Sequence, residues 1–425
     1  MKRETANVKQ PSPTVEKRVL DNGLTLLTKP SQANDIAAVT VMLGIGSIRE
    51  TDAQAGLSNL TQALLLKGTA SRTAEQIAVE MESTGARVSA YASRDYGAAS
   101  LIATSDGLAE ILPIFFDVLL NPSFPPDEVA HEIAQTLQKI RAKEDQFIQK
   151  AMELLAEAYY GAHPYHKPLL GYPETVSAFS RETVGDFFRA HYRPNNAILS
   201  AVGHFDRAWL VGQVEAHLGA ADPGPLPEAD GASVTPLSEP RQRIESRESR
   251  AAWLAVGYGA PSITDADYPA MEVLDAVLGG SMSCRLFTEL RDRRGLAYQV
   301  GSTYAARPGP SAFVAYIGTG PDQFEVAREG ILEELRKVCS ERVTEEELRI
   351  SKTYLKGTFI MGQERNSSQA AILARYESVG LGHDYVHRHP DLIDRVTAED
   401  VLRVARTYLS GAYALGAVAP KASET

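Results

Sequence analysis

Apolar residues along the chain form two kinds of pattern, which alternate from one end to the other. Short runs rich in Ala, Val, Leu and Ile at residues 37–43, 98–104, 251–257 and 311–317 have the length and composition of buried β-strands. Longer helical stretches lie between them, and adjacent strands are often joined by short turns. The pattern predicts an α+β fold of two α/β sandwiches, each a mixed, largely antiparallel sheet covered by helices on one face.

The two halves of the chain end in the same order of elements, which indicates an internal duplication. Ser180 has the side chain of a helix N-cap, Glu182 follows in the first turn, and a strand-like run occupies residues 197–202. In the second half, residues 397–401 are predicted to begin a helix and residues 413–418 to form the closing strand. A looser pair of long helices is predicted to begin at 124–128 and 343–347.

A Pro/Gly/Ala-rich stretch near residues 219–231 has the composition of a linker and shows neither helical nor strand periodicity. A chain of 425 residues is also too long for one ordinary core. We therefore predict a first domain at 1–222, a linker at 223–242 and a second domain at 243–425.

The charge and the apolar content exclude several functions. The net charge is −11, from 54 acidic and 43 basic residues, with no basic stripe interleaved with aromatics, so we expect no nucleic-acid partner. The same charge weakly favours cationic peptides. No apolar run approaches the roughly 20 residues that cross a bilayer, and residues 1–15 carry no apolar block of signal-peptide length. We therefore expect a cytoplasmic protein that does not enter a membrane.

Several short segments together resemble the pitrilysin/insulinase family of peptidases, whose zinc motif is inverted. The similar segments are spread over the first half of the chain, at residues 17–25, 44–50, 66–69, 163–165, 192–196 and 203–206. The subgroup that the chain resembles has two-domain subunits, like those of mitochondrial processing peptidase. The resemblance implies a half clamshell that closes against a second chain around a peptide substrate.

The segment 56–69 is similar to the helix that carries the family's H-x-x-E-H motif, in which two His bind zinc and the Glu activates water. Here those positions hold Asn59, Gln62 and Ala63. Asn and Gln are poor zinc ligands, Gln is no general base, and Ala has no donor atom. The apolar stripe of the helix is kept, at Leu57, Leu60 and Leu64.

The family's third zinc ligand is a Glu on a later helix, and matching that helix places Lys139 at its position. A lysine opposes a cation rather than binding it. We therefore expect no metal and no other cofactor on this chain. The resemblance implies that zinc is bound by the partner, a homologous subunit with an intact H-x-x-E-H motif.

The segment 285–298 resembles the signature of the family's second domain, in which an Arg precedes a Tyr by seven residues. Arg291 and Tyr298 have this spacing, and the resemblance implies that they donate hydrogen bonds to the scissile carbonyl. Arg293 and Arg294 stand close by, so a shift of register would select another arginine. Without the resemblance, a solvated Arg and a packed Tyr would be the ordinary interpretation.

Residues 89–93 occupy the place where the family's zinc subunit offers an edge strand to the peptide. Ala90 and Tyr91 are therefore candidate substrate-binding residues, since strand addition binds peptides through their backbone. On a chain without zinc, a purely structural strand is the stronger alternative.

The remaining candidate residues, which are histidines and cysteines, give weaker evidence for a functional site. His383, His387 and His389 have spacings that a metal clip could use, but Pro390 follows and no Glu stands among them. His163 and His166 are predicted to shape a turn around Pro164. Cys284 and Cys339 have no Cys or His at ligand spacing, and we interpret them as ordinary buried or half-buried thiols.

The sequence predicts a non-zinc subunit of a heterodimeric zinc metallopeptidase, which hydrolyses peptides only with its zinc-binding partner. The alternative is a non-catalytic scaffold or peptide-holding protein, resembling the core proteins of respiratory complexes. A third hypothesis is a homodimer that binds peptides without cutting them.

Overall fold

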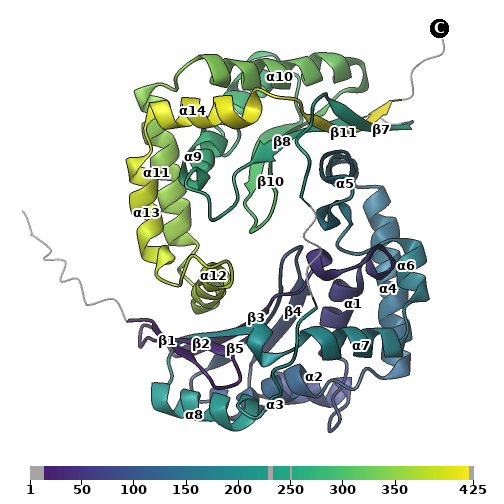
Figure 1. Ribbon diagram of the computed structural model, residues 1–425, viewed down its shortest axis with the longest axis vertical. Coiled ribbons are helices and arrows are strands. Elements are labelled where there is room, and N and C mark those ends of the chain that lie inside the picture. The colour runs from purple at the N-terminus through teal and green to yellow at the C-terminus, as the bar shows by residue number, and fades with distance from the viewer. Residues whose placement is uncertain (1–13, 228–232, 249–250, 421–425) are drawn as a thin grey trace, which may run out of the picture.

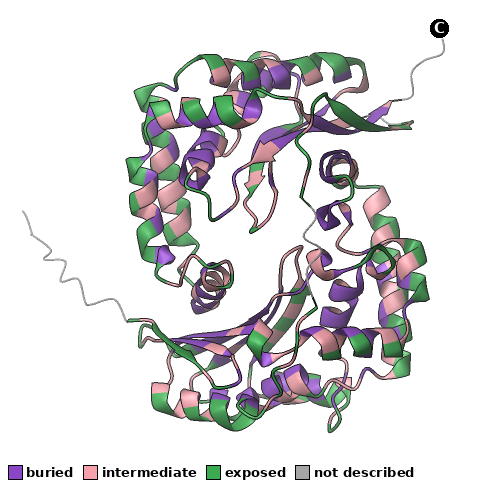
Figure 2. Cartoon of the chain, viewed as in Figure 1, coloured by how far each residue is buried: buried purple, intermediate pink, exposed green. Residues whose placement is uncertain are grey.

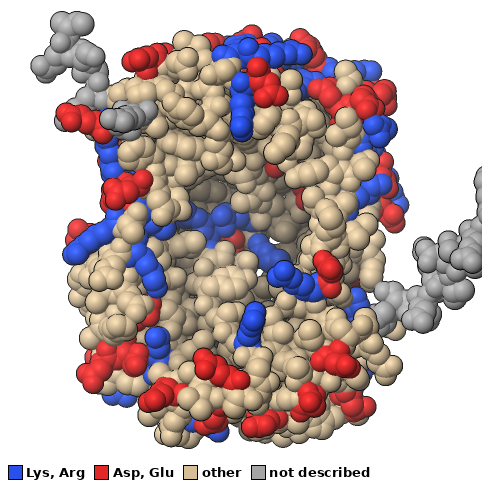
Figure 3. All heavy atoms as spheres, turned by 180° about the vertical axis from the view of Figure 1, so that it is seen from behind, with Lys and Arg blue, Asp and Glu red and all other residues tan. Residues whose placement is uncertain are grey.

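The computed structural model describes residues 14–227, 233–248 and 251–420. They form two β-sheets with helices packed around them, one from each half of the chain (Figure 1). The predicted α+β class and the two mixed sheets are confirmed. The halves surround a hollow, visible from behind in Figure 3.

The first sheet has the strand order β1-β2-β6-β3-β5-β4. Only β2 and β6 run parallel, and the other neighbours are antiparallel. The strands are β1 (Glu16–Val19), β2 (Thr25–Pro30), β3 (Ile36–Leu43), β4 (Arg87–Ala92), β5 (Gly97–Thr104) and β6 (Ala197–Gly203). The helices of this half are α1 (Leu57–Leu64), α2 (Ala74–Ser83), α3 (Leu108–Leu120), α4 (Pro126–Glu144), α5 (Phe147–Tyr160), α6 (Pro173–Ala178), α7 (Arg181–His191) and α8 (Arg207–Leu218).

The second sheet has the order β7-β11-β8-β10-β9, again with one parallel pair, β7 and β11. Its strands are β7 (Arg241–Arg247), β8 (Ala252–Ala260), β9 (Gln299–Ala305), β10 (Ser311–Thr319) and β11 (Ala414–Pro420). The helices are α9 (Tyr268–Leu278), a π-helix (Phe287–Arg293), α10 (Phe324–Ser340), α11 (Glu345–Met361), α12 (Asn366–Ser378), α13 (Tyr385–Arg395) and α14 (Ala398–Leu409).

The two strand orders match when β2, β6, β3, β5 and β4 are laid on β7, β11, β8, β10 and β9. The shared order and the single parallel pair are what the predicted duplication requires. The helix caps that led to this prediction are present: Ser180 caps α7 by accepting from Thr183 N, and Thr397 caps α14 by accepting from Asp400 N.

The predicted domain boundaries remain predictions. Residues 228–232 of the predicted linker lie outside the described residues, as do residues 1–13, 249–250 and 421–425 of the two predicted domains. Strand β7 begins at Arg241. No helix in the described parts of the chain is long and apolar enough to cross a membrane.

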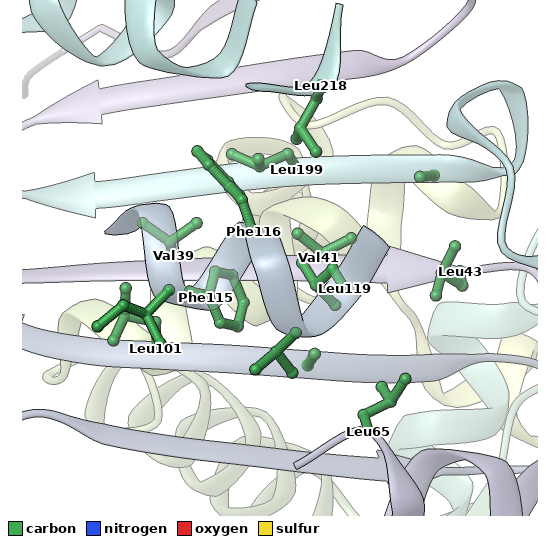
Figure 4. Packing of buried hydrophobic residues seen from close by; sticks show 14 of the residues in the cluster. Val39, Val41, Leu43, Leu65, Leu101, Phe115, Phe116, Leu119, Leu199 and Leu218 are labelled. Atoms are coloured by element: carbon green, nitrogen blue, oxygen red, sulfur yellow. The ribbon is translucent and has the colours of Figure 1, made fainter. Parts of the chain in front are cut away.

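Each half has its own core between the sheet and its helices. In the first half, Phe115 and Phe116 of α3 pack onto Val39, Leu101 and other apolar residues of the sheet (Figure 4). Burial is concentrated along these sheet–helix interfaces, while the outward faces of the helices are exposed (Figure 2). This packing holds the strands and helices that carry the candidate residues.

One helix of each half packs against the sheet of the other half. Helix α5 lies on β8 and β11, and α12 lies on β3 and β6 (Figure 1). The approach of α5 is so close that a Cβ at Gly416 would lie 2.2 Å from the backbone of Ala151. Only glycine leaves room for this contact. The second face of each sheet is therefore covered from across the molecule.

A buried carboxylate also joins the halves. Asp95, in the turn between β4 and β5, is 5% exposed and accepts a hydrogen bond of 2.9 Å from Arg307 Nη1 in the turn between β9 and β10. The Tyr165 hydroxyl donates to the same carboxylate, and Arg375 of α12 lies 3.9 Å from it. The turns of the two edge hairpins are thus tied together by charge.

Replacing Asp95 with alanine should destabilise the protein by about 3 kcal/mol, because Arg307 would stay buried without its counter-charge. The free energy of unfolding in urea measures this loss. Asp186→Ala is the matched control, since that carboxylate pairs with Arg189 at the surface and should cost under about 0.5 kcal/mol. Equal effects of the two substitutions would contradict the assignment.

His191, at the end of α7, predicts a pH dependence. Burial, with a smaller effect of the Arg49 charge, lowers the pKa of its imidazole from 6.5 to about 4. A lowered histidine pKa means that the folded state loses stability as the pH falls from 6.5 toward 4. Wild type should therefore lose stability relative to His191→Gln over that range, measured by thermal unfolding. The exposed His387→Gln is the control, and a constant difference for His191→Gln would refute the prediction.

Candidate functional site

Helix α1 packs into the core through its leucine stripe, as predicted from the sequence. Leu57, Leu60 and Leu64 are fully buried in the first core. Gly56 precedes the helix with φ 94°, a left-handed conformation that favours glycine. A side chain there would also meet the backbone of Leu170 and Gly171. The leucine stripe therefore holds the helix in place whatever its other face carries.

The N-terminus of α1 is anchored by a buried carboxylate. Glu50 accepts hydrogen bonds from the backbone N–H groups of Gly56 at 3.0 Å and Ser58 at 2.7 Å. Lys167, itself buried, donates to the backbone oxygen of Glu50. Burial raises the pKa of the Glu50 carboxyl, against the opposing effect of these hydrogen bonds. Glu50 satisfies helix N–H groups that would otherwise be buried without acceptors.

The three motif positions of α1 are not arranged as a metal site. Asn59 and Ala63 are partly exposed, whereas Gln62 is fully buried. The Gln62 amide lies against Gly97 of β5, so close that a Cβ on Gly97 would be 2.2 Å from Gln62 Nε2. Neither amide atom of Gln62 has a hydrogen-bond partner among the residues that the structure describes. The position predicted to match the family's general base is therefore closed by packing.

Lys139 lies on α4, which packs against α1. Its ammonium group forms an ion pair of 3.1 Å with Glu132, a carboxylate that is almost completely buried, while the Lys139 side chain is 51% exposed. The Glu132 carboxylate is thus already neutralised by Lys139. A zinc ion needs three protein ligands, and Asn59, Gln62, Ala63 and Lys139 do not fit it.

The rest of the described chain holds no alternative metal centre: no group of three His, Cys, Asp or Glu residues in it could bind an ion. His383 pairs with Glu377 at 3.2 Å, and His389 pairs with Glu272 at 2.8 Å. These histidines therefore face different carboxylates. Cys284 is buried and Cys339 partly buried, both as free thiols.

Strand β4 is the last strand of the first sheet, paired only with β5. Ala90 packs toward the first core, and Tyr91 is 45% exposed. The Tyr91 ring meets that of Tyr96 edge-on, with centroids 6.1 Å apart. The backbone of β4 is therefore placed where an extended peptide could pair with it.

Arg291 lies in the π-helix, and Tyr298 directly precedes β9. The Arg291 guanidinium lies over the Phe287 ring, 4.7 Å from its centroid, and forms no ion pair with a described residue. Arg293 and Arg294 both bind Glu289, at 3.1 and 3.0 Å. Of the three arginines, Arg291 is thus the one left to bind a ligand.

Tyr298 has an anchored backbone and a free ring. Its N–H donates to Gly318 O at 2.8 Å, while the side chain is 64% exposed. No hydrogen bond, ion pair or ring contact between described residues connects Arg291 or Tyr298 with Asn59, Gln62, Lys139 or Tyr91. The two groups of candidate residues therefore lie in different halves of the chain and are not in direct contact.

Sequence reasoning missed Asp95, Arg307 and Arg375. Little in the sequence indicates these residues, because Asp95 lies in an ordinary turn between two strands. Its arginine partners lie more than two hundred residues away along the chain. A buried Asp next to several Arg residues is visible only once the two hairpins are seen to meet.

Two family models match the chain. The model described as insulinase (peptidase family M16) matches residues 25–172, and the one described as peptidase M16 inactive domain matches residues 178–355. An uncharacterised zinc protease of Mycobacterium tuberculosis is 29% identical over 95% of this chain and 93% of its own length. One from Bacillus subtilis is 26% identical over 96% and 98%.

Two solved structures share the fold over nearly the whole chain. A protease from Helicobacter pylori matches with a TM-score of 0.91 at 22% identity, covering 96% of this chain and all of that one. A peptidase M16 inactive domain from Pseudomonas fluorescens matches with a TM-score of 0.90 at 22% identity, covering 97% and 99%.

The closed position of Gln62 gives a stability prediction. Gln62→Met should raise the free energy of unfolding by about 1 kcal/mol, since it removes two buried polar atoms without partners while nearly preserving volume. Gln62→Glu should lower it, because it buries an unpaired carboxylate. Urea unfolding measures both, with the exposed Gln138→Met as control. A loss of stability in Gln62→Met would show that the amide is satisfied.

Proposed function

Since the chain belongs to the M16 peptidase family and has two sheets of the same order, we propose that it is the non-zinc subunit of a heterodimeric zinc peptidase. Its partner is a homologous subunit with an intact H-x-x-E-H motif, which holds the zinc, the general base and the attacking water. This chain contributes Arg291 and Tyr298. The substrate is a peptide.

The chemistry of Arg291 and Tyr298 suits this role. A guanidinium and a phenol both donate hydrogen bonds, and donors aimed at a scissile carbonyl bind more strongly as its oxygen becomes negative. One such donor is typically worth about 3 kcal/mol of barrier. Neither the guanidinium nor the phenol has to lose a proton in order to donate these hydrogen bonds. Both can therefore act without a metal ion on this chain.

The observation that carries the proposal is an asymmetry between the halves. In the first half, the motif positions have no ligands, Gln62 is packed shut and Lys139 neutralises Glu132. In the second half, Arg291 and Tyr298 are exposed, and neither forms an ion pair or a side-chain hydrogen bond with a described residue. Exposed groups of this kind are available to a substrate held between two chains.

Peptide binding on this chain is assigned to the free edge of β4. A peptide added there would pair with the backbone beside Ala90 and Tyr91, which tolerates many sequences. This edge is supported by its terminal place in the sheet.

The test is peptide hydrolysis by this chain, by an H-x-x-E-H partner, and by their mixture, with and without a chelator. Only the mixture should cut efficiently, and chelation should abolish its activity. Arg291→Ala or Tyr298→Phe in the mixture should lower kcat/KM about a hundredfold.

Arg293→Ala and Tyr354→Phe are matched controls, because Arg293 is paired with Glu289 and Tyr354 is a half-exposed tyrosine on α11. Both should leave kcat/KM unchanged. A larger effect of Arg293→Ala would move the role to that arginine. A mixture no better than the partner alone would overturn the catalytic proposal and favour the non-catalytic scaffold.

A further inference from the structure

Strand β4 presents its two faces to different surroundings. Val88 and Ala90 pack into the first core, on the side of α1 and α3. Because side chains alternate along a strand, Ser89 and Tyr91 point to the opposite face. Helix α12 covers that same face of the sheet, over β3 and β6. A peptide added to β4 would therefore place every second side chain on the face of α12.

Arg375 of α12 is the cation at this place. Its guanidinium lies over the Tyr96 ring, 4.9 Å from the centroid, and Tyr96 in turn contacts Tyr91. Burial raises the pKa of the Tyr91 hydroxyl, and the charge of Arg375 partly offsets that shift. The positive charge thus acts on the exposed side chain of the edge strand.

The hydrogen-bond donors of Arg375 are not used within the described chain. Its distance to Asp95 is 3.9 Å, too long for a hydrogen bond, and no other described residue accepts one from its side chain. The Asp95 carboxylate is instead occupied by Arg307 and by the Tyr165 hydroxyl. The Arg375 side chain is still 19% exposed, so a ligand can reach it.

The local charge is positive. Among the described residues, Asp95 is the one carboxylate in direct contact with Arg307 and Arg375. Arg94 is next to it in the chain and donates to the Tyr165 and Lys167 carbonyl oxygens, and burial and Arg307 lower its pKa. Arg307 and Arg375 therefore share one anion. Figure 3 shows Lys and Arg side chains in the hollow between the halves, with little acidic surface among them. This concentration contrasts with the net charge of −11.

We propose that Arg375 forms a subsite for an acidic side chain of a peptide bound along β4, so that the chain prefers acidic peptides there. A planar guanidinium with free N–H groups binds a carboxylate through two parallel hydrogen bonds. Tyr96 holds the guanidinium in place by stacking beneath it. The net charge favours cationic peptides at long range, but this short-range contact decides which side chain the strand accepts. The inference rests on the proposed peptide-binding function.

The experiment measures binding to the purified full chain without its partner. Two fluorescent peptides that differ only in Glu against Gln at alternate positions are compared by fluorescence polarisation. Wild type should bind the Glu peptide about tenfold more tightly, as expected for one charge-assisted contact. The preference should shrink as the salt concentration rises.

Arg375→Gln should bring the two affinities within about twofold, and Arg375→Lys should keep part of the preference because it keeps the charge. Arg349→Gln is the control, an exposed arginine on α11 paired with Glu346, and it should preserve the full preference. Thermal unfolding shows whether each variant is folded. If Arg375→Gln does not fold, the proposal is judged by comparing the preference of Arg375→Lys for the Glu peptide with that of wild type.

The proposal is overturned if wild type binds both peptides equally, if it binds neither, or if the preference survives in folded Arg375→Gln. The failure of the proposed function gives a different result. Acidic-peptide binding without any gain in hydrolysis on mixing with the partner would remove the catalytic role and leave the subsite. A gain in hydrolysis on mixing with the partner, without a preference for acidic peptides, would leave the catalytic role and remove the subsite.

Discussion

The architecture depends on the exchange of one helix between the halves. The central strands of each sheet carry apolar residues on both faces, and the helices of its own half cover only one of them within the described chain. The other face is buried by α12 on the first sheet and by α5 on the second. Neither half can bury its sheet alone, so the two must fold onto each other. The hollow between them and the meeting of the two edge hairpins at Asp95 follow from that exchange.

In the first half, helix α1 packs into the core although its predicted motif positions carry no zinc ligands. The leucine face of α1 fills the core and Glu50 caps the helix, so the packing of this helix does not depend on Asn59, Gln62 or Ala63 acting as ligands. The amide of Gln62 is packed against Gly97, and Lys139 is paired with Glu132. In the second half, the exposed Arg291 and Tyr298 contribute little to packing, so a role outside the chain is the simpler reason for their presence.

Much of the fold could be predicted from local signals. Ser180 and Thr397 cap the helices that they were expected to cap, and the apolar runs at 37–43, 98–104 and 311–317 lie in β3, β5 and β10. The positions of Asn59, Gln62 and Ala63 on one helix also followed from the sequence. The turn at His163 was predicted as well. Each of these depends on residues only a few positions apart.

The sequence by itself determined the elements and their repeated order, and it predicted the loss of zinc ligands, because caps, periodicity and ligand chemistry are local properties. The tertiary structure alone decided which helix covers which sheet, that Gln62 is closed in by Gly97, and that Arg307 and Arg375 converge on Asp95. These contacts join residues distant along the chain, and nothing in the pattern around either partner specifies the other. A buried charge finds its partner only when folding has brought the two hairpins together and removed the water between them.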